Sequence, residues 1–512
     1  MSAIAEATIA GSLSDKTTRM QIRGSGLLVM GYLLELAINF TPHLLLVRYL
    51  ATASYGAWAY ALSLVTAFQA FTLCMNEALQ RFVPIYHEQR EYAKLFGSIV
   101  FGLAATATIG CGFVAVFYLA PQAMGQMVRD KFAMDLLLLL IVLVPIEAIE
   151  TMLMRLFACF HRAREIFYLQ HVTSPFCRLV LVVVFIFLHK DLRFLAIGRV
   201  VLAIPTTILY GWLLARLMRR LGLLQELHKR IVLPSREMFV FSSPMVLSTA
   251  LYTLENALIV LLLDRSRGVT EVAFYRVVLP LAALNNVVMN AFSWLYVPSA
   301  SRLVARDDHR GIDHLYWRTA AWISVLTFPV FAITFCFAGA ITTYLYGERY
   351  AQSGAVLALL AIASYSNVAL GFNGVTLKVL GKIRYVLTSN LSSAVIKIAL
   401  CLLLIPRFGA FGAAASVVMG MIAYNVLMQW GLHRVAHVRM LGREYLPLAM
   451  LILVSSFSLF SLREIVGHNI YLAILLTAVA TGILLLAAKH RLSIATTFPE
   501  ALRVPVLGRL LA

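Results

Sequence analysis

Charged and amide side chains inside long apolar stretches are the residues of this chain that could do chemistry. Glu35, Asn39 and His43 recur at four-residue intervals, so they share one face of the helix expected there. A later apolar stretch carries Glu255 followed by Asn256. A charge inside lipid is costly, and a buried carboxyl can exchange protons. We therefore treat Glu35 and Glu255 as candidate proton or sodium sites.

One arginine and several asparagines form a second group. Arg276, Asn290 and Trp294 fall on about one face of a single predicted helix, with Asn285 and Asn286 nearby. Such residues can line a polar cavity. Asparagines inside membrane helices also form hydrogen bonds to neighbouring helices, and both interpretations stay open for them.

The other charges in apolar stretches have simpler explanations. Glu147 or Glu150 can pair with Arg178 on the next predicted helix, which would be a structural bond between helices. Arg199 and Glu77 lie close enough to helix ends to snorkel towards the membrane surface. We expect these residues to support the fold rather than to bind a ligand.

Composition indicates which elements must position these residues. Hydrophobic residues make up 61% of the 512 residues and charged residues 13%, whereas ordinary soluble domains are about 25% charged. This much apolar surface excludes a set of soluble domains and indicates a polytopic membrane protein. The six cysteines fall mostly in apolar runs without metal-ligand spacing, so we interpret them as packing residues and expect no metal site.

Spanning helices need roughly 20 apolar residues, because an α-helix rises about 1.5 Å per residue across about 30 Å of hydrocarbon. About fourteen stretches approach this length. The predicted spans are residues 26–47, 56–80, 95–119, 133–155, 171–188, 194–215, 238–262, 273–297, 319–345, 354–377, 386–405, 410–430, 446–462 and 470–488.

The longest connector, near residues 216–236, divides the chain into two parts of similar size. The halves share short matches in the same order, such as Leu34-Glu35 with Leu254-Glu255, which suggests an internal repeat. We predict two lobes of six helices each, followed by two further helices. The predicted segments are a polar N-terminus over 1–23, an N-terminal lobe over 24–216, a linker over 217–236, a C-terminal lobe over 237–430, two helices over 446–488 and a basic C-terminus over 489–512.

The formal net charge of +19 follows the predicted topology. With the N-terminus in the cytoplasm, the inner segments hold about three times as many Lys and Arg residues as the outer connectors. This distribution predicts that both termini are cytoplasmic. Because the positive-inside bias accounts for most of the basic excess, nucleic-acid binding is not needed to explain it.

The segment LLIPRFGAFGAAAS, residues 403–416, interrupts the apolar pattern most sharply. Pro406 cannot continue a helix, and Gly409 permits the backbone of a tight turn. The small residues from Gly412 onwards allow the next helix to pack closely. We therefore predict a very short extracytoplasmic hairpin between two spans, with Arg407 at the level of the outer headgroups.

This hairpin, within the longer segment from Val356 to Ala414, resembles the polysaccharide-biosynthesis transporters. These are Wzx-type flippases of the multidrug/oligosaccharidyl-lipid/polysaccharide (MOP) superfamily. The stretch from Leu34 to Phe71, with RYL followed by YGAWA, is similar to the first two helices of that family. The resemblance covers nearly the whole chain to about residue 430. It implies an all-α polytopic membrane protein with a MATE-like fold and a cavity lined mainly by the first, second, seventh and eighth helices.

The resemblance also implies a function, which is transport rather than catalysis. The protein would be a flippase of the bacterial inner membrane. Its cargo would be an oligosaccharide repeat unit on undecaprenyl diphosphate, for exopolysaccharide, capsule or O-antigen synthesis. Arg276, with Arg48 or Lys397, would contact the diphosphate, because Arg presents paired donors to phosphate. Lys397 could instead reach the outer surface. The residues that would bind sugar hydroxyls are Asn39, Asn285, Asn286 and Asn290.

Alternating access by rocking of the two lobes would move the cargo. No phosphate-binding loop of the form GxxxxGK[ST] occurs, so we expect an ion gradient rather than nucleotide hydrolysis to drive transport, and no cofactor. Polysaccharide polymerases and glycosyltransferases are candidate partners.

Two alternatives stay open. A peptidoglycan-precursor (lipid II) flippase or a small-molecule exporter would share the fold, although YGAWA and IPRFGAFGAA favour the polysaccharide branch. A membrane polysaccharide polymerase or glycosyltransferase would need catalytic groups at an accessible site, and the outer connectors are short. The inner run RDDHRGIDH, residues 306–314, could be mistaken for a metal or sugar-nucleotide site. We interpret it as a solvated loop between helices.

Overall fold

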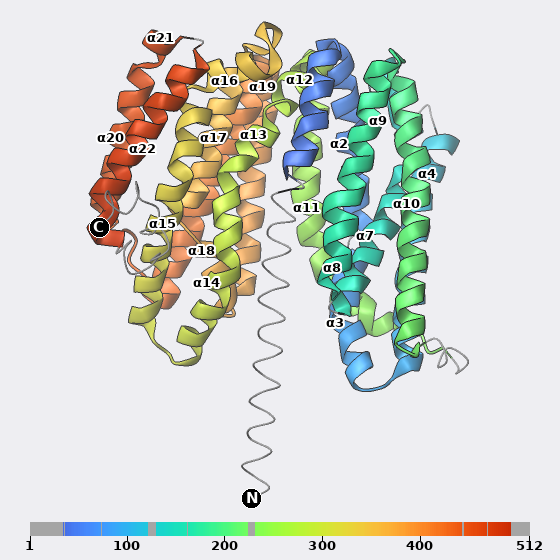
Figure 1. Cartoon of the computed structure of the whole chain (residues 1–512). Helices are drawn as coiled ribbons and strands as arrows, with labels where there is room; N and C mark the ends of the chain where they lie inside the picture. Colours follow the sequence, from blue (N-terminus) through green and yellow to red (C-terminus); the bar gives the residue numbers. More distant parts are fainter. Residues whose placement is uncertain are drawn as a thin grey trace, which may run out of the picture. The chain divides into compact units, whose positions relative to one another are not determined.

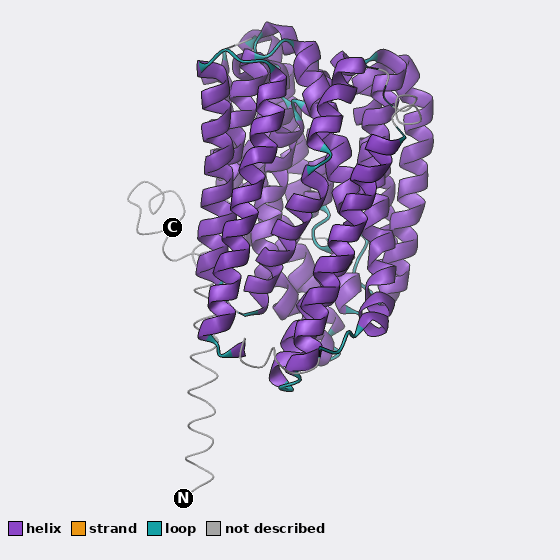
Figure 2. Cartoon of the chain, turned by 90° about the vertical axis from the view of Figure 1, so that its right-hand side faces the viewer, coloured by secondary structure: helices purple, strands orange, loops and turns teal. Residues whose placement is uncertain are grey.

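The structure is a computed structural model that describes residues 34, 36–72, 74–120, 128, 130–160, 162–223, 231–442, 445–467 and 469–492. These described residues form helices joined by short loops and contain no strand (Figure 2). The chain divides into two compact units, residues 1–257 and residues 258–512. The prediction of an all-α protein is confirmed. The predicted N-terminus 1–23 lies outside the described residues, as do residues 493–512 of the predicted C-terminal segment 489–512, whose first four residues belong to a helix.

Unit 1, residues 1–257, is built around helix α7 (Leu143–Cys159), which packs against α2, α3, α4 and α10. Met152 and Leu156 of α7 are fully buried with Leu79 of α3 and Leu95 of α4 in one apolar core. The other elements are a helix over 36–49, α2 (Thr52–Thr72), α3 (Cys74–Glu88), α4 (Tyr92–Leu119), α6 (Lys131–Leu140), α8 (Ala163–Ile166), the π-helix η1 (Phe167–Thr173), α9 (Ser174–Phe187) and α10 (Leu192–Arg220).

Helix α11 (Ser235–Arg267) runs past the boundary between the units, and the linker predicted over 217–236 stays a prediction. At its first turn, Glu237 accepts a hydrogen bond from the Tyr86 hydroxyl of α3 (2.9 Å). Burial and the neighbouring Glu237 carboxylate raise the pKa of Tyr86 to about 12, so this hydroxyl stays a neutral donor near pH 7. The bond ties the start of α11 to unit 1.

Unit 2, residues 258–512, is built around α15 (His309–Phe335), α17 (Ser353–Ala369) and α19 (Ile383–Ala436). Tyr316 and Phe328 of α15 are fully buried, and Leu432 of α19 belongs to the same core. Helices α20 and α22 pack against α15 at one side of this bundle (Figure 1). The other elements are α12 (Val269–Arg276), α13 (Leu279–Ala283), η3 (Leu284–Asn286), α14 (Val287–Ala305), α16 (Ala338–Tyr346), η4 (Glu348–Tyr350), α18 (Asn373–Val379), α20 (Leu446–Ser461), α21 (Arg463–Val466) and α22 (Ile470–Leu492).

Within the described residues, eight helices are long and apolar enough to cross a membrane, or nine if the bent pair α6 and α7 is one span. The chain is therefore a multi-pass membrane protein. The predicted number of spans, fourteen, stays a prediction. Some predicted spans do not meet the criterion as single helices: α20 has 16 residues, and the span predicted over 56–80 is divided between α2 and α3. The spans predicted over 386–405 and 410–430 both belong to α19.

The predicted turn at Gly409 is confirmed. Gly409 has φ +57° and ψ −132°, a backbone conformation that breaks α19 into two limbs. Pro406 was predicted to end the first limb, but the helix continues past it to the break at Gly409. A proline near the end of a helix removes one hydrogen bond and leaves the following residues free to continue the last turn.

The ends of both limbs at Gly409 receive partners from side chains of α11 and α12. Arg267 donates to the Pro406 carbonyl through Nε (3.3 Å) and Nη2 (3.2 Å), and Nη2 also donates to the Arg407 carbonyl. Glu271 accepts a hydrogen bond from the Ala410 backbone N–H (2.6 Å). These bonds satisfy groups that a helix end leaves unpaired, so they fix the hairpin to the start of unit 2.

Candidate functional site

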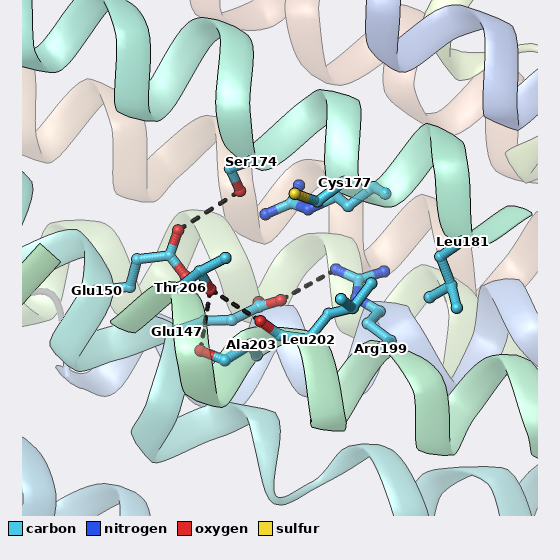
Figure 3. Close-up of a pocket in the computed structure, with 10 residues that line it drawn as sticks. Glu147, Glu150, Ser174, Cys177, Leu181, Arg199, Leu202, Ala203 and Thr206 are labelled. Carbon is cyan, nitrogen blue, oxygen red and sulfur yellow. Dashed lines mark hydrogen bonds and ion pairs between the residues drawn. The ribbon is translucent and has the colours of Figure 1, made fainter. Parts of the chain in front are cut away.

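Four charged side chains line one small pocket within unit 1. Glu147 and Glu150 lie one turn apart on α7, Arg178 comes from α9, and Arg199 comes from α10. Figure 3 shows Glu150 facing Ser174 at the start of α9, and Glu147 facing Arg199. The pocket has a volume of about 30 Å³, room for about two water molecules. Residues three positions apart share a helix face, which is why one face of α7 presents both carboxyls.

Glu147 is held by two other helices. Arg199 Nη2 lies 3.2 Å from Glu147 Oε1, and Gln69 Nε2 of α2 donates to Glu147 Oε2 (2.6 Å). Both carboxylate oxygens are engaged, and the side chains of Glu147 and Arg199 are only 17% and 22% exposed. A buried ion pair with additional hydrogen bonds is a strong geometric constraint. Glu147 therefore joins α2, α7 and α10.

Glu150 has a different environment. The Ser174 hydroxyl lies 3.4 Å from Glu150 Oε1, which is a long hydrogen bond. Arg178 lines the same pocket, and its positive charge attracts both Glu147 and Glu150. Arg199 pairs with Glu147 at 3.2 Å, whereas the Arg178 side chain forms no hydrogen bond or ion pair with another described residue. The pocket thus contains a tight pair, Glu147 with Arg199, and a loose pair, Glu150 with Arg178.

A comparison with protein families identifies the chain. The model of the family described as "Polysaccharide biosynthesis protein" matches residues 22–304, which is more than half of the sequence. The chain belongs to the polysaccharide biosynthesis protein family. The predicted family is therefore confirmed.

Other proteins similar to this family member are membrane proteins. The "Uncharacterized membrane protein MJ1068" of Methanocaldococcus jannaschii is 22% identical over 466 residues, which cover 86% of this chain and 88% of that protein. Among solved structures, the lipid II flippase MurJ in an inward closed conformation aligns with a TM-score of 0.70 and 11% identity, over 89% of this chain and 97% of that one.

An inward-facing multidrug resistance MATE family transporter of the MOP superfamily aligns with a TM-score of 0.63 and 14% identity, over 79% and 95% of the two chains. At these identities the likeness shows the fold. The predicted MATE-like fold is confirmed.

The pairing within the pocket differs from what the sequence of this polysaccharide biosynthesis protein suggested. Arg199 was expected to snorkel to the membrane surface, but it pairs with Glu147. Arg178 was expected to bond with Glu147 or Glu150, and it lies in the pocket with both without a direct bond to either. The reason is that α10 packs against α7 as well as α9, which brings Arg199 opposite Glu147. Gln69 was not identified from the sequence, although an amide within an apolar helix is a usable signal.

The predicted cavity residues belong to both units. Asn39 is half-buried and Arg48 is exposed on the helix over 36–49, and Glu255 is buried on α11. These three and Glu35 belong to residues 1–257, and the other predicted residues belong to residues 258–512. Glu35, like the side chains of Glu77 and Trp294, lies outside the described residues. The joining of all these residues in one cavity stays a prediction.

The predicted residues of unit 2 lie on four elements. Arg276 is half-buried at the end of α12, Asn286 is half-buried on η3, and Asn290 is exposed on α14. Asn285 is fully buried and donates through Nδ2 to Thr334 Oγ1 of α15 (3.1 Å), the kind of bond that also joins helices structurally. Lys397 is half-buried on the first limb of α19 and packs against Gly420 of the second.

The run RDDHRGIDH was interpreted as a solvated loop, and this is wrong for its second half. Helix α15 begins at His309, with Asp308 accepting a hydrogen bond from the Gly311 N–H (2.8 Å) as its N-cap. Asp313 is buried and accepts from both the backbone N and Nε of Arg439 (2.9 Å each). No group of three or more His, Cys, Asp or Glu side chains among the described residues could hold a metal ion. These contacts give the run a structural role.

Proposed function

We propose that this protein is a flippase that moves oligosaccharide repeat units linked to undecaprenyl diphosphate across the bacterial inner membrane. The polymer would be an exopolysaccharide, a capsule or an O-antigen. The observation that carries the proposal is the family match over residues 22–304. The two-unit all-helical fold, shared with a lipid II flippase and a MATE transporter, supports transport as the activity. Polysaccharide polymerases and glycosyltransferases are the proposed partners.

The cargo has an anionic diphosphate, a polar glycan and a long hydrocarbon tail. In the proposed mechanism, Arg276, with Arg48 or Lys397, contacts the diphosphate in a water-filled cleft. The prenyl tail stays in lipid, because transferring a hydrocarbon chain into water is unfavourable. The lobes rock to alternate access, with both chain termini in the cytoplasm. The residues proposed to bind sugar hydroxyls are Asn39, Asn285, Asn286 and Asn290.

We also propose that an ion gradient drives transport. Glu35 and Glu255 are the proposed proton or sodium sites, because a carboxyl removed from water can exchange a cation. Glu35→Gln and Glu255→Gln would then slow uphill transport without preventing downhill movement of the cargo. Transport that is indifferent to both proton and sodium gradients would contradict the coupling.

The test of the function is complementation of a strain that lacks its oligosaccharide flippase and makes a matching cargo. Surface polysaccharide is measured together with the side of the membrane on which the lipid-linked intermediate accumulates. Restored polymer with the intermediate moved outward supports the proposal. An intermediate that stays on the inner face, despite correct expression and the native cargo, contradicts it.

Arg276→Gln tests the site within the same assay. We expect loss of export with normal protein levels, because the substitution removes the charge that faces the diphosphate. Arg310→Gln is the matched control, because Arg310 is exposed on the first turn of α15. The Arg310→Gln variant should export at the level of the unaltered protein. Unchanged export by Arg276→Gln would remove this residue from the mechanism.

Lipid II transport is the second candidate function. It is favoured by the alignment with the lipid II flippase MurJ over 89% of this chain. Complementation of a strain depleted of its lipid II flippase distinguishes the two cargoes. Rescue there, without rescue of surface polysaccharide, would favour lipid II.

A further inference from the structure

The two carboxyls of the unit 1 pocket are chemically alike and have unequal partners. Glu147 receives a guanidinium at 3.2 Å and an amide at 2.6 Å, so its charge is satisfied in place. Glu150, one turn further along α7, receives one long hydrogen bond from Ser174. When two titratable groups share a site in unequal environments, the environments assign them different roles. Glu147 suits the role of a fixed anion, and Glu150 suits that of a group that changes its charge.

The surroundings of Glu150 are suited to proton exchange. The pocket has a volume of about 30 Å³, which is enough for about two waters that could carry a proton to the carboxyl. The Ser174 hydroxyl can donate to the ionised form or accept from the neutral form, so it serves both states. The charged and titratable groups that face Glu150 are Glu147 on its own helix, Arg178 and Cys177 on α9, and Arg199 and Tyr210 on α10.

Arg178 is the group whose position would report the protonation state. With both carboxyls ionised, the four charges of the pocket cancel. A proton on Glu150 leaves one net positive charge, and Arg178 then lacks a counter-ion of its own, because Glu147 is already paired with Arg199. A charge without a partner is unfavourable in lipid, so protonation favours movement of Arg178 away from α7.

The element that carries Arg178 has a built-in irregularity. Helix α9 is preceded directly by the π-helix Phe167–Thr173, and Ser174 is the first residue after it. The Tyr210 hydroxyl of α10 donates to the Leu169 carbonyl in this segment (2.7 Å). Short π-helical segments occur often at functional sites, where a register change re-aims the side chains that follow. The start of α9 is therefore the place to which we assign the movement of Arg178.

We propose that Glu150 binds and releases a proton during the transport cycle and that its ionised form draws Arg178 onto α7. The proton moves between a pocket water and a Glu150 oxygen, so a hydronium ion becomes water when the carboxyl is protonated. The role in a transport cycle rests on the proposed function, whereas the proton site itself does not. The proposal adds a coupling residue on α7 to the proposed sites Glu35 and Glu255.

The proton site is tested by difference infrared spectroscopy of the purified full-length protein in lipid nanodiscs, titrated between about pH 5 and pH 9. Exposed carboxyls are mostly ionised over this range, so a protonated carboxyl absorbs apart from them. We expect the titrating carboxylic-acid absorption of the unaltered protein to persist undiminished in Glu147→Gln and to lose the share of one carboxyl in Glu150→Gln, while any share of Glu35 and Glu255, the other proposed proton sites, remains. No titrating absorption in the unaltered protein, an undiminished absorption in Glu150→Gln, or a loss only in Glu147→Gln would overturn the proposal.

Arg178→Gln keeps the test decisive if Glu150→Gln does not fold. Removal of this cation disfavours the ionised carboxyl, so the midpoint of the band should move to higher pH by about one unit or more. An unmoved midpoint would show that Glu150 and Arg178 are not coupled. In proteoliposomes, Glu150→Gln should also make cargo movement independent of a pH gradient. Failure of the unaltered protein to move any oligosaccharide lipid would refute the proposed function and leave the infrared result to decide the proton site.

Discussion

Removal of the Arg199 guanidinium tests how strongly the charged pocket holds unit 1 together. In Arg199→Ala, Glu147 keeps the bond from Gln69 and loses the ion pair at 3.2 Å. Both partners are largely buried, with 22% and 17% of their side-chain surface exposed. Breaking a buried pair by removing one partner costs about 3–5 kcal/mol. We expect a loss near the lower end, about 3 kcal/mol, because Gln69 and the charge of Arg178 still stabilise the carboxylate.

The unpaired charge, rather than lost packing, should cause most of this destabilisation. Adding Glu147→Gln to Arg199→Ala removes that charge and should restore about 1–2 kcal/mol. Arg193→Ala is the matched control on the same helix, because Arg193 pairs with Asp135 at 2.7 Å while both side chains are about half exposed. Its cost should be below about 1 kcal/mol, as for other exposed pairs.

The assay is reversible unfolding of the purified protein in mixed detergent micelles, followed by helical circular dichroism. Four proteins make a double-mutant cycle: the unaltered chain, the two single variants and the double variant. A coupling energy below about 0.5 kcal/mol would refute the reasoning, because residues in direct contact should not be additive. A cost for Arg193→Ala equal to that for Arg199→Ala would refute the role assigned to burial.

Two further predictions concern unit 2, and both use the same unfolding assay. Gly409→Ala should destabilise the protein by about 2–4 kcal/mol. The backbone at φ +57° and ψ −132° is strained for alanine, and the new Cβ would lie 2.7 Å from Glu271 Cδ. A loss below about 0.5 kcal/mol would contradict this prediction. Asp313→Ala should cost about 1–3 kcal/mol, because it removes two hydrogen bonds and an Nη2 contact at 2.8 Å to Arg439, whose side chain is 56% exposed. An unchanged stability would show that these bonds do not hold the end of α19 to α15.

The membrane-protein class and the family could be predicted from the sequence, because both depend on local features. Apolar stretches of sufficient length predict helices, and a glycine between a proline and small residues predicts a turn, which Gly409 confirms. The same reasoning selected Glu147, Glu150 and Arg178 as a group. It could not select Arg199 as the partner of Glu147, because 52 residues separate them and α8, η1 and α9 lie between their helices in the sequence.

Inside lipid, apolar helix faces do not identify their neighbours, because lipid tails are as apolar as the side chains that would cover them. Which helices touch is decided by packing shape and by a few polar contacts. Gln69 contacts Glu147 across 78 residues, and no periodicity in either segment predicts that contact. Nearness in sequence correctly placed Arg178 beside Glu147 and Glu150, but it did not identify Arg199 as the partner of Glu147. The physical rule that each intramembrane charge needs a partner was correct, and the identity of the partner needed the fold.

The loose pair, Glu150 with Arg178, is harder to explain by a contribution to folding stability than the tight pair, Glu147 with Arg199. Glu147, Arg199 and Gln69 bind three helices together, so their desolvation is offset by bonds that position the helices. Glu150 and Arg178 add two more charges, and within the described residues their side chains form one hydrogen bond, the long one that Glu150 accepts from Ser174. Apolar residues of similar size would stabilise the same space at lower cost. A purely structural pocket would therefore be expected to contain two charges, and the second pair is better explained by a change of charge during the work of the protein.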